Sequence, residues 1–231
     1  MGHMITISAG EGSGAIPAYV AQPVAPARAA IIVVPEIFGV NGGIRSKVDE
    51  WAALGYLAVA PDIFWRFAPG VELDPDVPHQ LQQAFGNMQQ YRAEHGVADI
   101  AAILVWSHAQ FVEKTGVVGF CLGGRLAYMA AARTQVDAAV GYYGVMIDTM
   151  LDEAAAITRP LALHIPTADH FVGPDAQAAI HAALDHHPQV TLWDYPGLDH
   201  GFAASTGARR NEAAATLADQ RTRAFFAAHL A

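Results

Sequence analysis

Short apolar stretches recur along the chain and alternate with longer stretches in which apolar residues have helical spacing. Residues 29–34 form a continuous, largely β-branched apolar stretch, which is typical of a central parallel strand. Residues 47–54 predict a helix that ends at Gly55, and residues 56–60 predict a strand that Pro61 ends. A strand, a helix and a second strand at this spacing form a parallel βαβ unit.

The alternation continues to the C-terminus. Residues 5–7 and 18–21 predict short strands joined by a glycine-rich turn at residues 10–14, which favours an antiparallel hairpin at the sheet edge. A long loop at residues 62–77 is expected to have a functional role and to fold over the site. The further predicted strands are 117–120, 138–142, 161–165 and 190–195, and the further helices are 77–94, 97–113, 148–156, 175–186 and 211–230, with an alanine-rich helix directly after residue 121.

We therefore predict an α/β fold: one mostly parallel sheet with an antiparallel N-terminal edge, helices on both faces and no separate lid domain. Residues 4–231 are expected to form a single domain, and we interpret residues 1–3 as an expression scar before a native Met4.

A turn of the form Gly-X-Cys-X-Gly lies between the strand 117–120 and the helix that follows it. Gly119, Gly123 and Gly124 allow a turn too sharp for side chains, and such a turn would hold Cys121 in a strained and exposed conformation. A helix N-terminus beside a thiol favours the thiolate. The alternative is that the single cysteine is a buried apolar residue. The spacing of the three glycines favours a catalytic nucleophile.

Composition narrows the possible partners and the location. The chain has 231 residues, of which 53% are hydrophobic and 15% charged, and its net charge is −9 with no basic cluster. Nucleic acid and anionic membranes are therefore poor partners, and no stretch is long and apolar enough to cross a membrane. One cysteine permits no internal disulfide, so we expect a cytoplasmic location. We also expect a monomer. The histidines lack ligand spacing and no phosphate-binding lysine follows the glycines, so we expect no metal and no cofactor.

Loops at the carboxyl ends of parallel strands converge on one site, and four of these loops carry reactive side chains. Glu36 follows the strand 29–34 and Cys121 follows the strand 117–120. Asp169 follows the strand 161–165 and His200 follows the strand 190–195. The order nucleophile, acid, histidine is that of the α/β-hydrolases. His200 would act as general base and then as acid, while Asp169 would orient its imidazole. His170, beside Asp169, is the competing candidate for the base, but only His200 follows the last strand.

Each of these residues also has a structural alternative. Asp169 could cap a helix, and Glu36 could be an ordinary surface carboxylate, although its neighbours are apolar. The backbone N–H of Leu122, after the nucleophile, and that of Ile37, after the strand 29–34, are the predicted oxyanion-hole donors.

The sequence resembles the dienelactone hydrolase family of α/β-hydrolases over nearly its whole length. The shared segments include residues 35–41, 61–62, 66–70, 119–124, 141–145, 169–172 and 200–202. The resemblance implies a carboxymethylenebutenolidase-like hydrolase that cleaves a lactone or carboxylic ester through a Cys121-His200-Asp169 triad and a thioester. It also implies that Glu36 contacts the resting thiol.

The same resemblance implies substrate-binding roles for Arg66, which matches one of two family arginines, and for Phe38 and Tyr143, which lie in shared segments. At the position of the second arginine this chain has Ala204, and this difference weakens the expectation that dienelactone is the substrate. Arg209 and Arg210 follow shortly after and are candidate replacements.

Three alternatives stay open at this point. The substrate could be a less anionic ester or lactone. A non-catalytic relative could use the same pocket for ligand binding, although no triad member is missing. A thiol redox protein could use Cys121, although the chain has no resolving cysteine.

Overall fold

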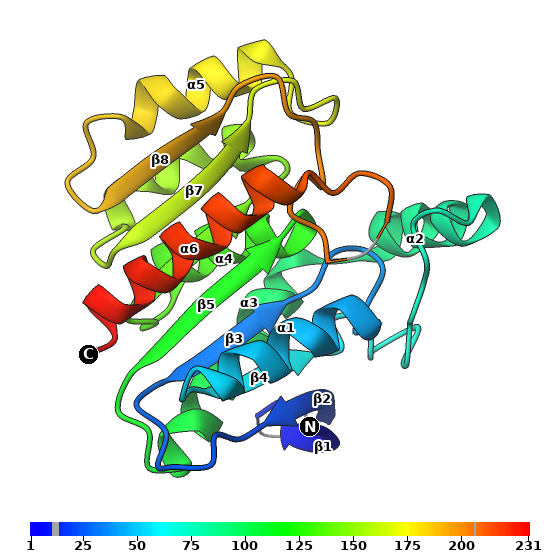
Figure 1. Cartoon of the computed structure of the whole chain (residues 1–231), viewed down its shortest axis with the longest axis vertical. Helices are drawn as coiled ribbons and strands as arrows, with labels where there is room; N and C mark the ends of the chain where they lie inside the picture. Colours follow the sequence, from blue (N-terminus) through cyan, green and yellow to red (C-terminus); the bar gives the residue numbers. More distant parts are fainter. Residues whose placement is uncertain (11–13, 206) are drawn as a thin grey trace.

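A computed structural model describes residues 1–10, 14–205 and 207–231. In this part of the chain the strands form one eight-stranded sheet with the order β1-β2-β4-β3-β5-β6-β7-β8 (Figure 1). The strands are β1 (His3–Ser8), β2 (Ala15–Ala21), β3 (Ala30–Val34), β4 (Leu57–Pro61), β5 (Thr115–Phe120), β6 (Ala138–Tyr142), β7 (Leu161–Pro166) and β8 (Val190–Tyr195).

The sheet is antiparallel only at its N-terminal edge. Strand β2 pairs antiparallel with β1 and with β4, and every other pairing is parallel. The predicted mostly parallel sheet with an antiparallel edge is thus confirmed. Most of the turn expected at residues 10–14, namely residues 11–13, lies outside the described residues.

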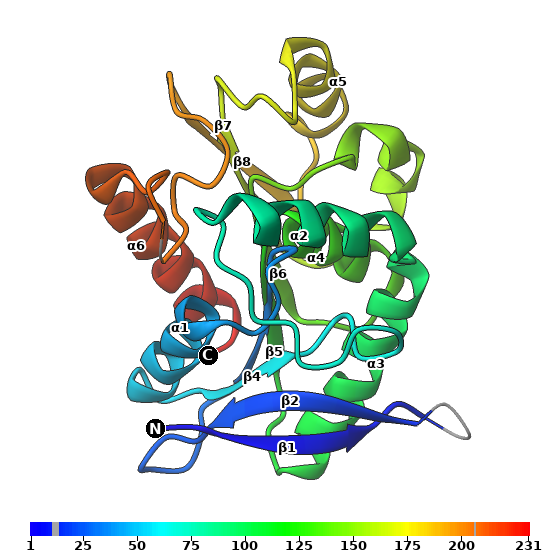
Figure 2. The ribbon, with the colours of Figure 1, turned by 90° about the vertical axis from the view of Figure 1, so that its right-hand side faces the viewer.

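Helices cover both faces of the sheet (Figure 2). Helices α1 (Gly42–Ala53) and α6 (Glu212–His229) lie on one face. The other face is covered by α3 (Ala93–Ala109), α4 (Leu122–Arg133) and α5 (Pro174–Leu184). Helix α2 (Pro78–Gln90) instead lies beyond the carboxyl edge of the sheet, where the loops that carry the candidate residues also end (Figure 1).

Several predicted helices differ from the structure in their bounds. The helix predicted at residues 77–94 ends at Gln90, and the one predicted at residues 97–113 runs from Ala93 to Ala109. Helix α1 begins five residues before the predicted start at residue 47, because the Asn41 side chain accepts a hydrogen bond from the Ile44 N–H and caps the helix. The segment predicted as a helix at residues 148–156 is a 3₁₀ helix, η1 (Ile147–Ala156). Met150 has non-helical dihedrals and kinks it into two short pieces, the length at which 3₁₀ geometry is common.

The core is built on the strands that carry the central loops. Every residue of β3 and β5 is buried, as expected for strands covered by helices on both faces. Among the described residues, no helix combines the length and the apolar character that a membrane crossing requires.

The junction of β5 with α4 packs its backbone directly against the end of β3. A Cβ atom at Gly123 would lie 2.3 Å from the carbonyl oxygen of Val34 and 2.7 Å from that of Pro35. A Cβ atom at Gly119 would lie 1.9 Å from the carbonyl oxygen of Gly123. Backbone atoms cannot move aside as side chains do, so glycine is required at both positions.

We predict that Gly123→Ala lowers the free energy of unfolding by about 1–3 kcal/mol or more, because the added methyl group overpacks this junction. Urea unfolding followed by circular dichroism measures the change. Gly86→Ala is the control, since a Cβ atom there meets nothing within 4 Å and alanine favours helix α2 by up to about 1 kcal/mol. Equal stability of the two variants would contradict this account of the junction.

Candidate active site

Cys121 occupies a strained backbone conformation between β5 and α4. Its φ is 55° and its ψ is −114°, a combination that non-glycine residues rarely adopt. The conformation is held by the Cys121 N–H, which donates to the carbonyl oxygen of Tyr142 at 3.0 Å, and by the glycine packing described above. The residue is the N-cap of α4, but its side chain makes no capping hydrogen bond. In contrast to the predicted exposed conformation, Cys121 is only 7% exposed, and it lines the cavity described below.

Asp169 and His200 form a buried pair on the loops after β7 and β8. The Nδ1 of His200 lies 2.9 Å from Oδ2 of Asp169, and both side chains are at most 2% exposed. The other carboxylate oxygen accepts hydrogen bonds from the N–H groups of Phe171 at 2.8 Å and Val172 at 3.2 Å. The alternative that Asp169 serves as a helix cap is not supported, since α5 begins only at Pro174 and its N-cap is Gly173.

The charge on His200 is stabilised by its neighbours. Burial by itself lowers the pKa of His200, but the sulfur of Cys121 and the carboxylate of Asp169 outweigh it and raise that pKa to about 10. Within the described chain the Nε2 atom of His200 is buried without a hydrogen-bond partner. Because Nδ1 is engaged by Asp169, Nε2 is the ring nitrogen free to exchange a proton with the thiol or a substrate.

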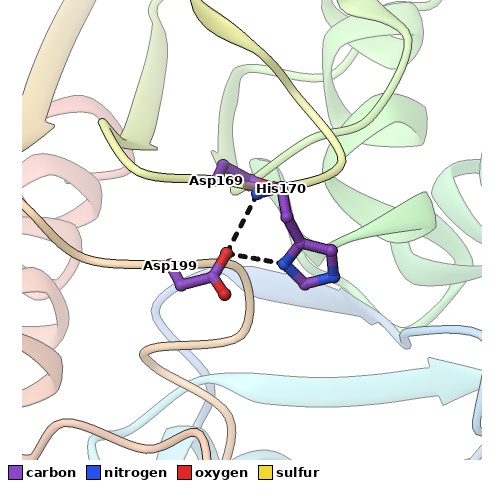
Figure 3. Close-up of side chains that lie close together, drawn as sticks. All are labelled: Asp169, His170 and Asp199. Atoms are coloured by element: carbon purple, nitrogen blue, oxygen red, sulfur yellow. Dashed lines mark hydrogen bonds and ion pairs between the residues drawn. The ribbon is translucent and has the colours of Figure 1, made fainter.

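A second His-Asp pair ties the same two loops together (Figure 3). Oδ1 of Asp199 accepts hydrogen bonds from the N–H of His170 at 3.0 Å and from the N–H of His200 at 2.6 Å, and it also lies 2.7 Å from Nδ1 of His170. The N–H of Phe171 is held by Asp169. The hydrogen bonds to Asp199 fix the backbone next to Asp169 and at His200. They also lower the pKa of Asp199 to about 2, against the opposing effect of its partial burial.

The donor atoms of Asp169, His170 and Asp199 lie within 4.8 Å of one another, which is a spacing that could hold a metal ion. His170 and Asp199 bind each other directly, however, and both oxygens of Asp169 already accept hydrogen bonds. The three side chains are thus already engaged in hydrogen bonds, and the partner of Asp169 is the imidazole of His200.

A cavity of about 470 Å³ opens above Cys121 and His200. Its lining combines predicted site residues with residues from α2 and from the loops after β4, β7 and β8. The predicted residues in the lining are Glu36, Ile37, Phe38, Cys121 and His200, and the additional ones are Pro75, Asp76, Leu81, Phe85, Met88, Val145, His170, Phe171 and Arg209. The structure therefore brings together residues from six separate parts of the chain.

Tyr143 lies below this cavity instead of lining it. Its ring meets that of His200 edge-on at 4.9 Å and that of Phe202 at 5.8 Å. Burial raises the pKa of the Tyr143 hydroxyl well above its usual range, and the proximity of Glu36 and Cys121 raises it further. The phenol thus stays neutral, and its ring packs against the imidazole of His200.

Of the two predicted oxyanion-hole residues, Ile37 lines the cavity, and Leu122 directly follows Cys121, which also lines it. Leu122 is the first residue of α4, where an N–H group has no partner within the helix, and Ile37 lies in the turn after β3. Among the described residues neither N–H donates to another backbone group outside the regular elements. Both donors are therefore free for a ligand.

Arg66 is placed elsewhere. Its guanidinium binds Asp99 through two hydrogen bonds of 2.7 and 2.8 Å and stacks on the Trp65 ring at 4.3 Å. It is not among the residues that line the cavity. The substrate-binding role expected for Arg66 remains a prediction, and these contacts do not support it.

The sequence indicated only some of the remaining cavity residues. Arg209 lies over the Phe38 ring at 5.8 Å, and within the described residues it forms no ion pair. The sequence marked it only as a candidate replacement because nothing showed its direction. The apolar positions of α2 at residues 81, 85 and 88 share one helix face and could have been found from their spacing. No signal in the sequence links Asp199 to His170.

Comparison with known proteins is consistent with this architecture. The sequence profile of the Dienelactone hydrolase family matches residues 16–230. A provisionally named carboxymethylenebutenolidase of Azospirillum brasilense is 41% identical, with 98% of each chain covered. Carboxymethylenebutenolidase 1 of Cupriavidus pinatubonensis is 35% identical, with 90% of each chain covered. The dienelactone hydrolase structure from Anabaena variabilis has a TM-score of 0.74 at 15% identity, with 100% of this chain and 99% of that chain covered, a likeness of fold alone.

We predict that part of the stability depends on pH through His200. Its pKa is raised in the folded protein from about 6.5 in an unfolded chain, so its contribution is complete below pH 6.5 and is lost as the pH rises toward 10. In Asp169→Asn the carboxylate charge is removed, and the fall of the unfolding free energy between pH 6.5 and 10 should become shallower.

Urea unfolding at several pH values measures this slope. Glu113→Gln, a change at an exposed carboxylate, is the control and should keep the parent slope. Parallel curves for the parent and Asp169→Asn would show that Asp169 does not stabilise the charged imidazole.

Proposed function

Because this chain belongs to the dienelactone hydrolase family, we propose that it hydrolyses a lactone or carboxylic ester by acyl transfer to Cys121. The observation that carries the proposal is the placement of a strained Cys121 and the buried His200-Asp169 pair on one cavity. A nucleophile, a base and a residue that orients the base are the three parts that such acyl transfer needs.

The proposed reaction has two acyl-transfer steps. Nε2 of His200 takes the thiol proton, which gives a thiolate–imidazolium pair that the raised pKa of His200 favours. The Cys121 sulfur then attacks the carbonyl carbon, and the carbonyl electrons move to oxygen. When the tetrahedral intermediate collapses, the C–O bond to the alcohol breaks and the imidazolium returns the proton to that oxygen. A water then loses a proton to His200 and attacks the thioester, which releases the acid and regenerates the thiol. For a lactone, the alcohol stays attached to the acyl group.

The oxyanion of each intermediate would be stabilised by the N–H groups of Leu122 and Ile37. The free amides at the N-terminus of α4 and in the turn after β3 support this role. The helix dipole adds to the favourable potential for negative charge at this point.

Glu36 is proposed to restrain the resting nucleophile. It lines the cavity together with Cys121, and a carboxylate beside a thiol opposes thiolate formation by like-charge repulsion. The charge of Glu36 also raises the pKa of Tyr143, which supports its closeness to the centre of the site.

Arg209 is the proposed contact for a substrate carboxylate. Of the arginines in the described residues, it is the one that lines the cavity. A guanidinium can bind both oxygens of a carboxylate, and this one has no carboxylate partner among the described residues. Arg66, in contrast, is already neutralised by Asp99.

We predict that Cys121→Ala abolishes ester hydrolysis and that Cys121→Ser loses about 10³-fold or more in kcat, since an alcohol is far less acidic than a thiol. His200→Ala should be similarly damaging because triad members act as a unit. Turnover of p-nitrophenyl acetate measures each effect.

His170→Ala and the remote His181→Ala are the comparison variants. Both should lose far less activity than His200→Ala. Inactive His170→Ala together with active His200→Ala would mean that the base is misassigned. Turnover retained in Cys121→Ala would refute the proposed chemistry and leave ligand binding or thiol redox activity as the remaining functions.

We predict that Arg209→Ala lowers the preference for a carboxylated lactone over its methyl ester by about tenfold, the effect of one charged hydrogen-bonded contact at a partly exposed site. Arg66→Ala should leave that preference much closer to the parent value. The ratio of kcat/KM for the two substrates is the measurement. A larger loss in Arg66→Ala than in Arg209→Ala would restore the sequence-based assignment.

A further inference from the structure

Helix α2 presents an apolar stripe to the cavity that contains Cys121. Leu81, Phe85 and Met88 follow one another at spacings of four and three residues, lie on one face of the helix and all line the cavity. The residues between them that face away, such as Gln82 and Gln83, are exposed and polar.

The stripe is only partly covered by the protein itself. Leu81, Phe85 and Met88 are each half-buried, whereas Ala84 and Asn87 on the adjoining face of the same helix are buried. Phe171 is 45% exposed, and its ring packs against that of Phe85 with their centres 6.1 Å apart, so it extends the stripe. An apolar surface that remains in contact with water gains free energy when an apolar ligand covers it.

The cavity is also larger than the chemistry alone requires. Cavities of 300–1,000 Å³ enclose ligands of drug size, and this cavity measures about 470 Å³. A five-membered lactone ring at Cys121 would occupy only a minor part of it and would leave the α2 wall unfilled.

We infer that the natural substrate is a carboxylic ester or lactone with an extended alkyl or aromatic group that packs against the surface formed by α2 and Phe171. This inference rests on the proposed acyl transfer to Cys121 and names the substrate class of the same site. Arg209, which stands over Phe38, would hold any carboxylate, so the apolar and anionic ends of the substrate are bound by different groups.

Two ester series test the inference on the intact protein. One series lengthens the acyl chain of p-nitrophenyl esters from acetate to octanoate, and the other lengthens the alcohol of alkyl acetates from methyl to octyl. We expect kcat/KM to rise at least about tenfold over the first four added methylenes in one series, within a limit of about fourfold for each methylene.

Variants then locate the effect. Phe85→Ala should reduce the ratio of kcat/KM for the long ester to that for the acetate at least about fivefold, and Met88→Ala, one turn further, should reduce it in the same direction. Gln82→Ala, on the outer face of α2, is the matched control and should keep the parent ratio. Thermal unfolding shows that each variant is folded, and because the readout is a ratio, loss of active protein does not affect it.

The outcomes separate this inference from the proposed function. If kcat/KM does not depend on chain length in either series while turnover still requires Cys121, the inference is overturned and the proposed hydrolysis stays in place. A chain-length preference that persists in both Phe85→Ala and Met88→Ala would also overturn it. Hydrolysis that survives Cys121→Ala would overturn the proposed function itself.

Discussion

The close backbone approach between the start of α4 and the end of β3 is the constraint on which the candidate site depends. Gly119 and Gly123 permit contacts that any Cβ atom would prevent, and the resulting turn leaves Cys121 with a φ of 55°. Strain at this residue is tolerated because β3 and β5 are buried on both faces and cannot yield. The rigid core thus determines where the sulfur points.

The candidate site depends, second, on the electrostatic environment of His200. His200 is buried, which disfavours its charged form, yet the Asp169 carboxylate and the Cys121 sulfur together hold its pKa near 10. Asp169 can do so because its other oxygen is fixed by two backbone N–H groups, and Asp199 fixes the adjoining backbone on both loops. The charge distribution therefore follows from loop geometry that the ends of β7 and β8 create.

Much of this arrangement could be predicted from the sequence. The strands and the convergence of Cys121, Asp169 and His200 follow from periodicity and from the order of loops in a parallel sheet, because both are local patterns with a fixed topology. The direction of long side chains does not follow in this way. Arg66 has the expected position in the chain, but Asp99, 33 residues away, holds its guanidinium outside the cavity.

Because the direction of side chains is not visible in the sequence, sequence reasoning also missed the part of the cavity wall that α2 forms. The polar, glutamine-rich composition of residues 78–90 favours a solvated helix, and only the placement of α2 beyond the sheet edge turns its few apolar residues toward Cys121 (Figure 1). The start of α1 was likewise misjudged, since the Asn41 cap outweighs two glycines that disfavour a helix. Tertiary placement decides the first case, and a local capping hydrogen bond decides the second.

The central claim is that the sulfur of Cys121 is the nucleophile, and reversible modification tests it most directly. Methyl methanethiosulfonate adds a small S-methylthio group to a free thiol, and this chain has one cysteine, so intact mass gives the modified fraction at each time. The account predicts that hydrolysis of p-nitrophenyl acetate falls in proportion to that fraction and returns when dithiothreitol removes the group. Full activity in fully modified protein would contradict it.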